Sequence, residues 1–513
     1  MRPGPTSTSS DVRGAGTPRP LSRRPAGSGR RRAGVALLLA GLLLGCTDDG
    51  APRRGDAAAD PGVQTPRLEL ASERWAGDLD GMRERHVVRA LVVPSQINYF
   101  VADGRPQGVA HDLLAAFERQ LNRRYPPERN RPGIRVVVIP TSRDDLLPAL
   151  LEGRGDIAVA GLAGTPGRLT GADFSAPFVR DVAALLVTGP ATPAPAALDD
   201  LAGREVGVRP SSSAHEQLLA LSRRLILAGR APLRLRLLPE ALHDADLMAL
   251  VATGRLAATV VDDLSARYWT RVHPQLVVHP GIALERGGES GWMLRQDNPQ
   301  MKAEIDRFAR GHRQGTLFGN TVLRRYSAPR AAAAGASFAA IDALFRRYAE
   351  RYDLDPLLLR AQGYQESRLD HGAVSRAGAV GIMQVMPQTG AALGVGDIHQ
   401  LEANIHGASK YLRDLLDRYF PAVELDQLNR TLFAVAAYNA GPTRIARLRR
   451  QATERGLDPN RWFGQVELLV AAEIGRETVD YVHNVFEYYA TYRLLAASET
   501  ARDRARAEFN DQT

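Results

Sequence analysis

The pattern of hydrophobic and polar residues changes across residues 327–336, an alanine-rich stretch. Before it, short runs rich in β-branched residues alternate with amphipathic stretches of helical period. The strand-like runs are 87–93, 134–139, 157–160, 183–187, 205–208 and 258–261, and the helix-like stretches include 110–122, 143–152, 215–228 and 247–253. Alternating strands and helices are typical of parallel sheets, which bind ligands at the carboxyl ends of their strands. We therefore predict two small α/β lobes over residues 69–326.

Residues 337–500 lack strand-like runs and read as helices. The apolar residues of the first predicted helix recur at i, i+3, i+4 and i+7, at Ile341, Leu344, Phe345 and Tyr348. Asp355-Pro356 has the form of an N-cap followed by a first-turn proline, and it predicts a second helix over 357–365. We expect an all-α domain after a linker at 327–336, and then a charged tail over 501–513.

Residues 1–45 have the pattern of an export signal. Three arginines, 30–32, precede an apolar run that is shorter than the about 20 residues of a membrane-spanning helix. The single cysteine, Cys46, follows this run, so no internal disulfide can form. The segment 43–46 (LLGC) resembles a bacterial lipoprotein box, which implies cleavage before Cys46 and acylation of its sulfur.

In that resemblance, Thr47 after the cysteine implies sorting to the outer membrane, facing the periplasm. A plain signal peptide, or a cysteine at the end of a short helix, is the alternative. Residues 46–68 are rich in Ala, Pro, Gly and Asp and predict a flexible tether.

Charge and composition exclude some classes of function. The net charge is +9, but the export signal holds eight arginines and one acid, so the rest of the chain is nearly neutral. We therefore expect no nucleic-acid partner. The 11 histidines are dispersed and no glycine-rich phosphate loop is visible, so we expect no metal and no cofactor.

Several motifs in residues 69–326 resemble periplasmic solute-binding proteins of the polar-amino-acid type. They are 108–113 (GVAHDL), 151–157 (LEGRGDI), 165–168 (TPGR) and 173–178 (DFSAPF). The resemblance implies two lobes that close on a ligand across a hinge.

The same resemblance implies that Arg168 binds the ligand's carboxylate and that Asp262 binds its ammonium group. Arg168 as a solvated loop residue and Asp262 as a helix N-cap are the alternatives. Pro166-Gly167 departs from the acidic residues usual in the family, so a peptide fragment suits the site as well as an amino acid.

Glu366 falls at the end of the apolar helix predicted over 357–365. Burial disfavours a charged carboxylate and raises its pKa, which suits a general acid near neutral pH. A surface glutamate at a helix end is the alternative. Downstream, Gln384 follows a run of small residues and offers an amide suited to sugar hydroxyls and N-acetyl groups.

Four motifs together resemble the lytic transglycosylase domain related to goose-type lysozyme. They are Glu366-Ser367, Gly381-Ile382-Met383-Gln384, Ala437-Tyr438-Asn439 and Glu477-Thr478-x-x-Tyr481-Val482. The resemblance implies that Glu366 is the catalytic acid and that the other site residues bind sugar. In it, Ser367, Gln384 and Asn439 orient sugar and N-acetyl groups, while Tyr438 and Tyr481 line the cleft.

Alternatives remain for these residues. N-capping is the alternative for Ser367 and Asn439, and core packing for Tyr438 and Tyr481. Glu477 is expected to make a structural hydrogen bond. Asp370 is expected in a loop or cap, so the family pattern supplies one carboxylate where ordinary glycosidases use two.

The whole arrangement looks like a membrane-bound lytic transglycosylase of the F type. That implies cleavage of the MurNAc-GlcNAc β-1,4 bond in peptidoglycan with a 1,6-anhydro-MurNAc product. It also implies modulation by a muropeptide or amino-acid-like ligand of the first domain, and attachment to the membrane by lipid. Hydrolysis as in a lysozyme, or a non-catalytic envelope receptor or scaffold, is the alternative.

Overall fold

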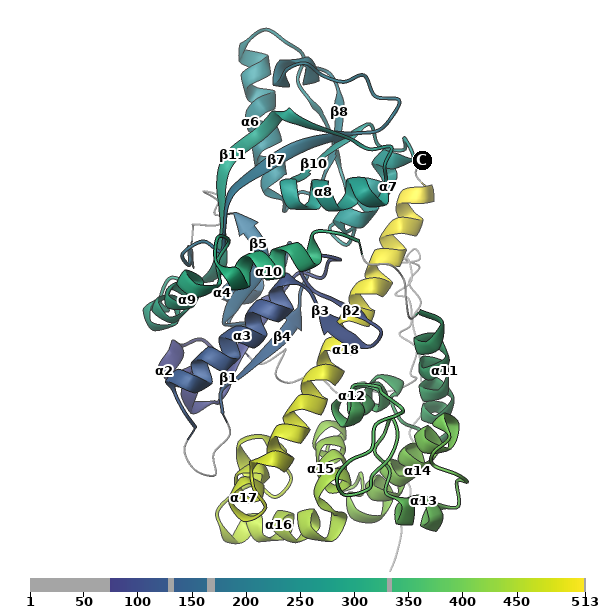
Figure 1. Ribbon diagram of the computed structural model, residues 1–513. Helices are drawn as coiled ribbons and strands as arrows, with labels where there is room; N and C mark the ends of the chain where they lie inside the picture. The colour runs from purple at the N-terminus through teal and green to yellow at the C-terminus, as the bar shows by residue number, and fades with distance from the viewer. Residues whose placement is uncertain (1–73, 128–132, 164–170, 330–334, 512–513) are drawn as a thin grey trace, which may run out of the picture. The chain divides into compact units, whose positions relative to one another are not determined.

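A computed structural model describes residues 74–127, 133–163, 171–329 and 335–511. The predicted export signal, the tether, Cys46 and Arg168 lie outside the described residues. All described residues belong to one unit, Thr65–Thr513, in which an α/β region precedes a helical region (Figure 1). Within the described ranges, no helix is both long and apolar enough to cross a membrane.

The α/β region contains a nine-stranded sheet with two parallel groups. The first group consists of β4 (Arg135–Pro140), β1 (Val87–Val92) and β5 (Ile157–Ala163), in that order. The second group consists of β10 (Ala258–Asp262), β8 (Glu205–Val208) and β9 (Arg234–Leu237). Five of the six predicted strands lie in these groups, each of which corresponds to one of the two predicted lobes, and the sixth, 183–187, lies in β7.

Two long antiparallel strands join these groups, and the sequence pattern did not predict them as such. β7 (Val179–Thr188) and β11 (Val277–Arg295) pair with each other, β11 also pairs with β5, and β7 also pairs with β10, all in antiparallel register. The pairing of β11 with β7 shifts register after His279, where Pro280-Gly281 interrupts the alternation. The expectation of parallel sheets therefore holds for the two groups and not for β7 and β11, because the proline and glycines of β11 have the local pattern of a turn rather than of a strand.

The remaining strands are short. They are β2 (Phe100–Ala102), β3 (Arg105–Gln107), which pairs with β2 in a separate sheet, and β6 (Ala172–Phe174), which pairs with β11. The helices of the region are α2 (Leu79–Glu84), α3 (Val109–Arg124), α4 (Leu146–Leu151), α6 (Ser213–Leu227), α7 (Asp244–Ala252), α8 (Asp263–Val272), α9 (Pro299–His312) and α10 (Leu317–Tyr326), with a 3-10 turn at Leu198–Leu201.

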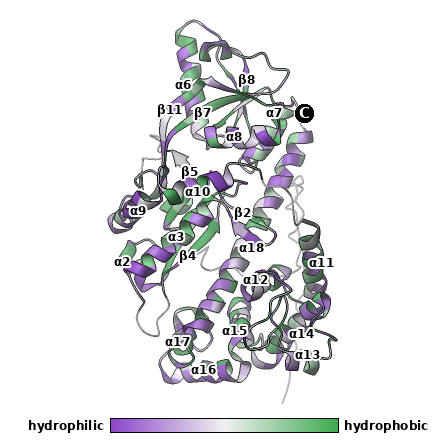
Figure 2. Ribbon diagram, in the orientation of Figure 1, coloured by the Kyte–Doolittle hydropathy of each residue, from purple (hydrophilic) through white to green (hydrophobic). Residues whose placement is uncertain are grey.

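The helical region has no strand among its described residues, as predicted. Its helices are α11 (Gly335–Arg351), α12 (Pro356–Ser367), α13 (Pro387–Leu393), α14 (Leu401–Tyr419), α15 (Gln427–Ala440), α16 (Pro442–Glu454), α17 (Glu467–Glu473) and α18 (Arg476–Asp511), with a π turn at Trp462–Val466. Hydrophobic and hydrophilic residues share each long helix (Figure 2), which is typical of helices with one buried face.

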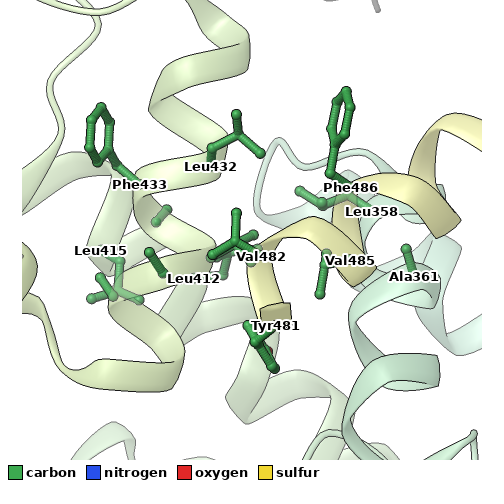
Figure 3. Packing of buried hydrophobic residues seen from close by; sticks show 14 of the residues in the cluster. Leu358, Ala361, Leu412, Leu415, Leu432, Phe433, Tyr481, Val482, Val485 and Phe486 are labelled. Carbon is green, nitrogen blue, oxygen red and sulfur yellow. The ribbon is translucent and has the colours of Figure 1, made fainter. Parts of the chain in front are cut away.

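A single core joins the central helices of this region. Leu358 and Ala361 of α12 meet Val482 and Val485 of α18 there, beside residues of α14 and α15 (Figure 3). Burying each leucine or valine side chain stabilises the fold by about 1.5–3 kcal/mol. The core thereby fixes α18 against the end of α12, which carries Glu366.

Helix α18 continues through the segment that was expected to be a charged tail. Ala505 and Phe509 are buried, and Arg502 and Arg506 make ion pairs with Asp246 of α7 at 2.7 and 2.5 Å. The charges of residues 501–511 therefore belong to a helix that packs on the α/β region.

Candidate active site

Local signals set the start and end of α12. The Asp355 side chain accepts a 2.8 Å hydrogen bond from the Leu357 backbone N–H, and Pro356 occupies the first turn, which confirms the predicted cap. The helix ends at Ser367, and the residue after it, Arg368, has a left-handed φ of 58°. Glu366 is therefore the last residue but one of the helix, held where the chain turns away.

Glu366 has the electrostatics of a general acid. Its side chain is half-buried, and burial raises its pKa from the ordinary 4.5 to about 7, although a hydrogen bond from Tyr481 opposes the rise. The Tyr481 hydroxyl donates this bond to Oε1 of Glu366 over 2.5 Å. A carboxyl with this pKa carries a proton in a large fraction of molecules near neutral pH.

The loop before α13 is shaped by Asn404 of α14, a residue the sequence analysis did not single out. Asn404 is fully buried, accepts a 2.9 Å bond from the Met383 N–H, and donates 2.9 Å bonds to the carbonyls of Val380 and Ile398. Gly381 has a φ of +80°, and a Cβ there would lie 2.5 Å from the Asn404 amide. A polar residue within the apolar face of α14 was the available signal.

Ser367 and Tyr438 hold this loop against the helices. Ser367 Oγ donates to the Ile382 carbonyl at 2.8 Å, and the Tyr438 hydroxyl donates to the Met383 carbonyl at 2.9 Å. Neither residue lies at a helix start, so the N-cap alternative does not describe Ser367. Both hydroxyl groups therefore donate their protons to backbone carbonyls of the protein.

Gln384 also uses part of its amide within the loop. Its backbone has a φ of 49°, and its Nε2 donates to the carbonyls of Gly381 at 2.9 Å and Ala373 at 3.1 Å. No hydrogen bond to Gln384 Oε1 is found within the described ranges. The acceptor end of the amide is thus the part that a ligand can use.

An open groove of about 570 Å³ runs beside the acid. It is lined by Gln365, Asn439, Arg476, Glu477, Asp480, Tyr481 and Asn484. Asn439 is exposed, and its Oδ1 accepts a 2.8 Å bond from Thr478. The groove thus brings together Asn439 and Tyr481 of the predicted residues, whereas Ser367, Gln384 and Tyr438 lie in or against the neighbouring loop.

Two further acids in this region occupy exposed positions. Asp370 accepts a 2.9 Å bond from the Gly372 N–H in the loop after α12, as expected for a loop residue. Glu477 lies at the groove, and no hydrogen bond to its side chain is found among the residues described. The expectation that Glu477 makes a structural hydrogen bond is therefore not met.

In the α/β region, Asp262 has the contacts of a helix N-cap. Its two carboxylate oxygens accept bonds of 2.9 and 2.7 Å from the backbone N–H and the hydroxyl of Ser265, at the start of α8. Burial raises the pKa of Asp262, while the Ser265 bonds lower it. The observed geometry is the capping alternative, and Arg168 lies outside the described residues.

A cavity of about 250 Å³ lies where β1, β4 and β8 end, as expected for ligand sites of such sheets. Its lining includes Thr141, Arg143, Arg209 and Asp244. Arg209 forms an ion pair with Asp244 and donates a 2.7 Å bond to the Leu242 carbonyl. None of these four residues was predicted from the sequence, although Thr141 and Arg209 each follow directly after a strand, which was the available signal.

Within the part of the chain that the structure describes, no three His, Cys, Asp or Glu side chains come close enough together to hold a metal ion. Next to the raised-pKa carboxyl of Glu366, the groove thus offers amides, one tyrosine hydroxyl and three charged side chains, which are Gln365, Asn439, Asn484, Tyr481, Arg476, Glu477 and Asp480.

Comparisons with known families match both regions. Residues 343–459 match the transglycosylase SLT domain, and residues 91–317 match the bacterial extracellular solute-binding proteins of family 3. Among solved structures, an ancestral arginine-binding protein bound to arginine is 20% identical, covering 47% of this chain and 98% of that one with a TM-score of 0.39. The assignment of the first region rests on the family model.

Curated relatives resemble the chain over both regions together. The membrane-bound lytic murein transglycosylase F of Desulfosudis oleivorans is 27% identical, over 80% of this chain and 90% of the relative. The protein of the same name from Shewanella denitrificans is 31% identical, over 70% of this chain and 75% of the relative. With this identity and coverage, and with both domain models in the same order, the chain belongs to the membrane-bound lytic murein transglycosylase F family.

Proposed function

We propose that this protein cleaves the β-1,4 bond between MurNAc and GlcNAc in peptidoglycan, with Glu366 as its only catalytic carboxyl. The observation that carries the proposal is the half-buried Glu366 side chain, with its pKa of about 7, beside an open polar groove. The family membership and the transglycosylase SLT domain support the same reaction.

The proposed reaction needs one proton donor and no water. Glu366 gives its proton to the glycosidic oxygen as the C1–O bond breaks, and the GlcNAc leaves with a free hydroxyl. The Glu366 carboxylate then takes the proton of the MurNAc 6-hydroxyl, whose oxygen bonds to C1 and closes the 1,6-anhydro ring. Intramolecular attack of this kind lowers the activation free energy by on the order of 7–11 kcal/mol. Proton transfer by a positioned side chain raises the rate about 10²–10⁴-fold.

The surroundings of Glu366 favour this route over hydrolysis by a carboxylate pair. Burial and the Tyr481 hydrogen bond are the causes of its pKa shift, and no second carboxylate is among them. A retaining glycosidase would place a second carboxyl about 5–5.5 Å away, where its charge would act strongly on the first.

The roles of the other residues follow from their contacts. Asn439 and Tyr481 line the groove and are proposed to contact sugar directly, and Gln384 offers its Oε1 to a hydroxyl or an N–H group. Ser367 and Tyr438 are proposed to hold the loop that carries Gln384.

Mass analysis of the sugar ends released from digested murein tests the reaction. Wild type is expected to release anhydro ends, and Glu366→Gln to release none at a detectable rate. Reducing ends would establish a hydrolase. A Glu366→Gln variant as active as wild type would displace Glu366 as the acid, and an inactive wild type would favour the receptor alternative.

The envelope location is proposed on separate grounds. The LLGC segment before Cys46 and the membrane-bound relatives support a lipoprotein of the outer membrane that faces the periplasm. Metabolic labelling with a radioactive fatty acid is expected to mark the wild-type chain and not Cys46→Ser. Equal labelling of both chains would contradict acylation at Cys46.

We further propose that the α/β region binds a muropeptide or an amino-acid-like ligand and thereby modulates cleavage. The solute-binding family model and the cavity at Thr141, Arg209 and Asp244 support this proposal. A coupling of about 1–3 kcal/mol would change the rate about 5- to 150-fold. Murein digestion by the full chain at increasing muropeptide concentrations tests it, and an unchanged rate would remove the regulatory role.

A further inference from the structure

Gln362 is a buried polar residue for which the helical core supplies no partner. It lies one turn before Glu366 on α12, so the two side chains share a face of the helix. Its side chain is 0% exposed, and neither Oε1 nor Nε2 of its amide has a hydrogen-bond partner within the described residues. Burying an amide without hydrogen-bond partners costs free energy. Gln362 is therefore a candidate for a role in the neighbouring site.

The neighbouring polar group is the Tyr481 hydroxyl. Burial and the charge of Glu366 raise the pKa of Tyr481, and the Gln362 amide acts on the same hydroxyl to lower it. The amide and the hydroxyl are therefore close, although their geometry falls short of a hydrogen bond here. Because Tyr481 also donates to Glu366 at 2.5 Å, its hydroxyl interacts with both side chains.

The two protonation states of Glu366 make opposite demands on Tyr481, whose hydroxyl carries a single proton. Beside the carboxylate, Tyr481 donates that proton to Glu366, and its own oxygen is open to a donor. Beside the protonated acid, Tyr481 accepts from Glu366, and its proton needs an acceptor elsewhere. A primary amide offers a donor at Nε2 and an acceptor at Oε1. Since neither end of the Gln362 amide is tied to another group, either end is free to turn toward Tyr481.

We infer that Gln362 is a positioning residue that completes a hydrogen-bond chain through Tyr481 to Glu366 in both protonation states. The inference rests on the proposed role of Glu366 as the acid and base. It assigns to Gln362 no contact with substrate. Its effect is to keep the Tyr481 hydroxyl aligned on Oε1 while the proton leaves Glu366 and returns.

Gln362→Met tests the inference, because methionine has a similar length and no amide. In the full chain acting on murein, kcat is expected to fall about three- to tenfold with KM nearly unchanged. The basic limb of the pH profile is expected to move up by about half a unit, because the carboxylate state loses a charge-assisted chain. Ser409→Ala is the matched control, since Ser409 is also fully buried and its hydroxyl donates to the Ile405 carbonyl of its own helix, so the pH profile should stay in place.

A double-mutant cycle with Tyr481→Phe separates positioning from packing. If Gln362 acts through the Tyr481 hydroxyl, Gln362→Met has little further effect on the profile of Tyr481→Phe. Equal effects in both backgrounds, or an unmoved wild-type profile after Gln362→Met, would overturn the inference. If Gln362→Met does not fold, Gln362→Asn replaces it in the double-mutant cycle. Asparagine keeps the amide in a shorter side chain.

Glu366→Gln distinguishes failure of the inference from failure of the proposed function. An inactive Glu366→Gln with a normal Gln362→Met rejects the role of Gln362 alone. A fully active Glu366→Gln rejects the acid itself, and with it the chain that ends on it.

Discussion

The Tyr481 hydroxyl donates a 2.5 Å hydrogen bond to Oε1 of Glu366, across 115 positions of sequence. No other hydrogen bond to this carboxyl is found among the described residues, so Oε2 is the oxygen left for the substrate. The bond orients the carboxyl at the end of α12, and it also opposes the rise in pKa that burial causes. Orientation and acidity of the proposed acid thus depend on the same partner.

Tyr481→Phe removes this bond and keeps the aromatic ring in the core. Because the bond lowers the pKa of Glu366, that pKa should rise further above about 7. The acid must be protonated to act, so the basic limb of kcat/KM should move to higher pH. We expect kcat at the optimum to fall about 10- to 100-fold, as the carboxyl loses its orientation.

Steady-state rates on purified murein between pH 5 and pH 9 measure both effects of Tyr481→Phe. Tyr411→Phe is the control, because Tyr411 packs against Tyr438 with ring centres 5.3 Å apart, and no hydrogen bond between Tyr411 and Glu366 is found in the part of the chain that the structure describes. An unmoved basic limb in Tyr481→Phe would show that Tyr481 does not set the acidity of Glu366.

Glu366→Gln should change the stability of the protein in a pH-dependent way. The folded-state pKa of about 7 exceeds the ordinary 4.5, so the stability associated with the bound proton is full below about 4.5 and is lost as pH rises through 7. Glutamine is neutral at every pH, so the variant does not lose this stability as pH rises. We expect the variant to be more stable than wild type at pH 8 by about 1–3 kcal/mol and nearly equal to it at pH 4.5.

Thermal unfolding of both chains at these two pH values checks this prediction. A Glu366→Gln chain that melts below wild type at pH 8 would mean that the carboxylate is stabilised in the fold, contrary to the raised pKa. The same preparations assayed on murein show whether stability and activity move in opposite directions, as the acid role requires.

Asn404→Leu should damage both the fold and the site. The change leaves the Met383 N–H and the carbonyls of Val380 and Ile398 without their buried partner. We expect a loss of about 2–4 kcal/mol in stability and at least about tenfold in activity, because the loop that carries Gln384 loses its anchor. Gln400→Ala is the control, since Gln400 is exposed and makes no side-chain cap bond at the start of the same helix. Equal melting temperatures for the two variants would contradict the anchoring role.

Asp156→Ala tests the buried ion pair of the α/β region. Arg89 of β1 and Asp156 meet at 2.8 Å, and both side chains are 0% exposed. Removing one partner leaves a buried charge uncompensated, which should cost about 3–5 kcal/mol. Asp199→Ala removes a half-exposed partner of Arg224 and should change stability by less than about 1 kcal/mol. Calorimetry of the full chains compares them, and a small effect of Asp156→Ala would mean that water or other groups replace the carboxylate.

Strand positions in the α/β region could be predicted from the sequence, because they depend on residues that are neighbours in the chain. Alternating apolar runs predicted β1, β4 and β5 close to their observed limits. The antiparallel pairing of β11 could not be predicted from the sequence, because the proline and glycines of this strand have the local pattern of a turn. Only partner strands on both sides make that segment extended.

In the candidate site, the sequence placed Glu366 at a helix end and Asp370 in a loop, since caps and apolar spacing act within a few residues. It did not assign Ser367 and Tyr438 to the loop backbone.

The amino-acid sequence by itself determined the helix that carries Glu366, because an N-cap, a first-turn proline and an apolar face are local properties. The tertiary structure alone decided that Tyr481 meets Glu366, that Asn404 anchors the opposite loop, and that Gln362 is buried beside them. Hydrogen bonds between residues far apart in the chain exist only after the core has brought their helices together. Acidity and alignment, the properties that catalysis requires, therefore arise from packing.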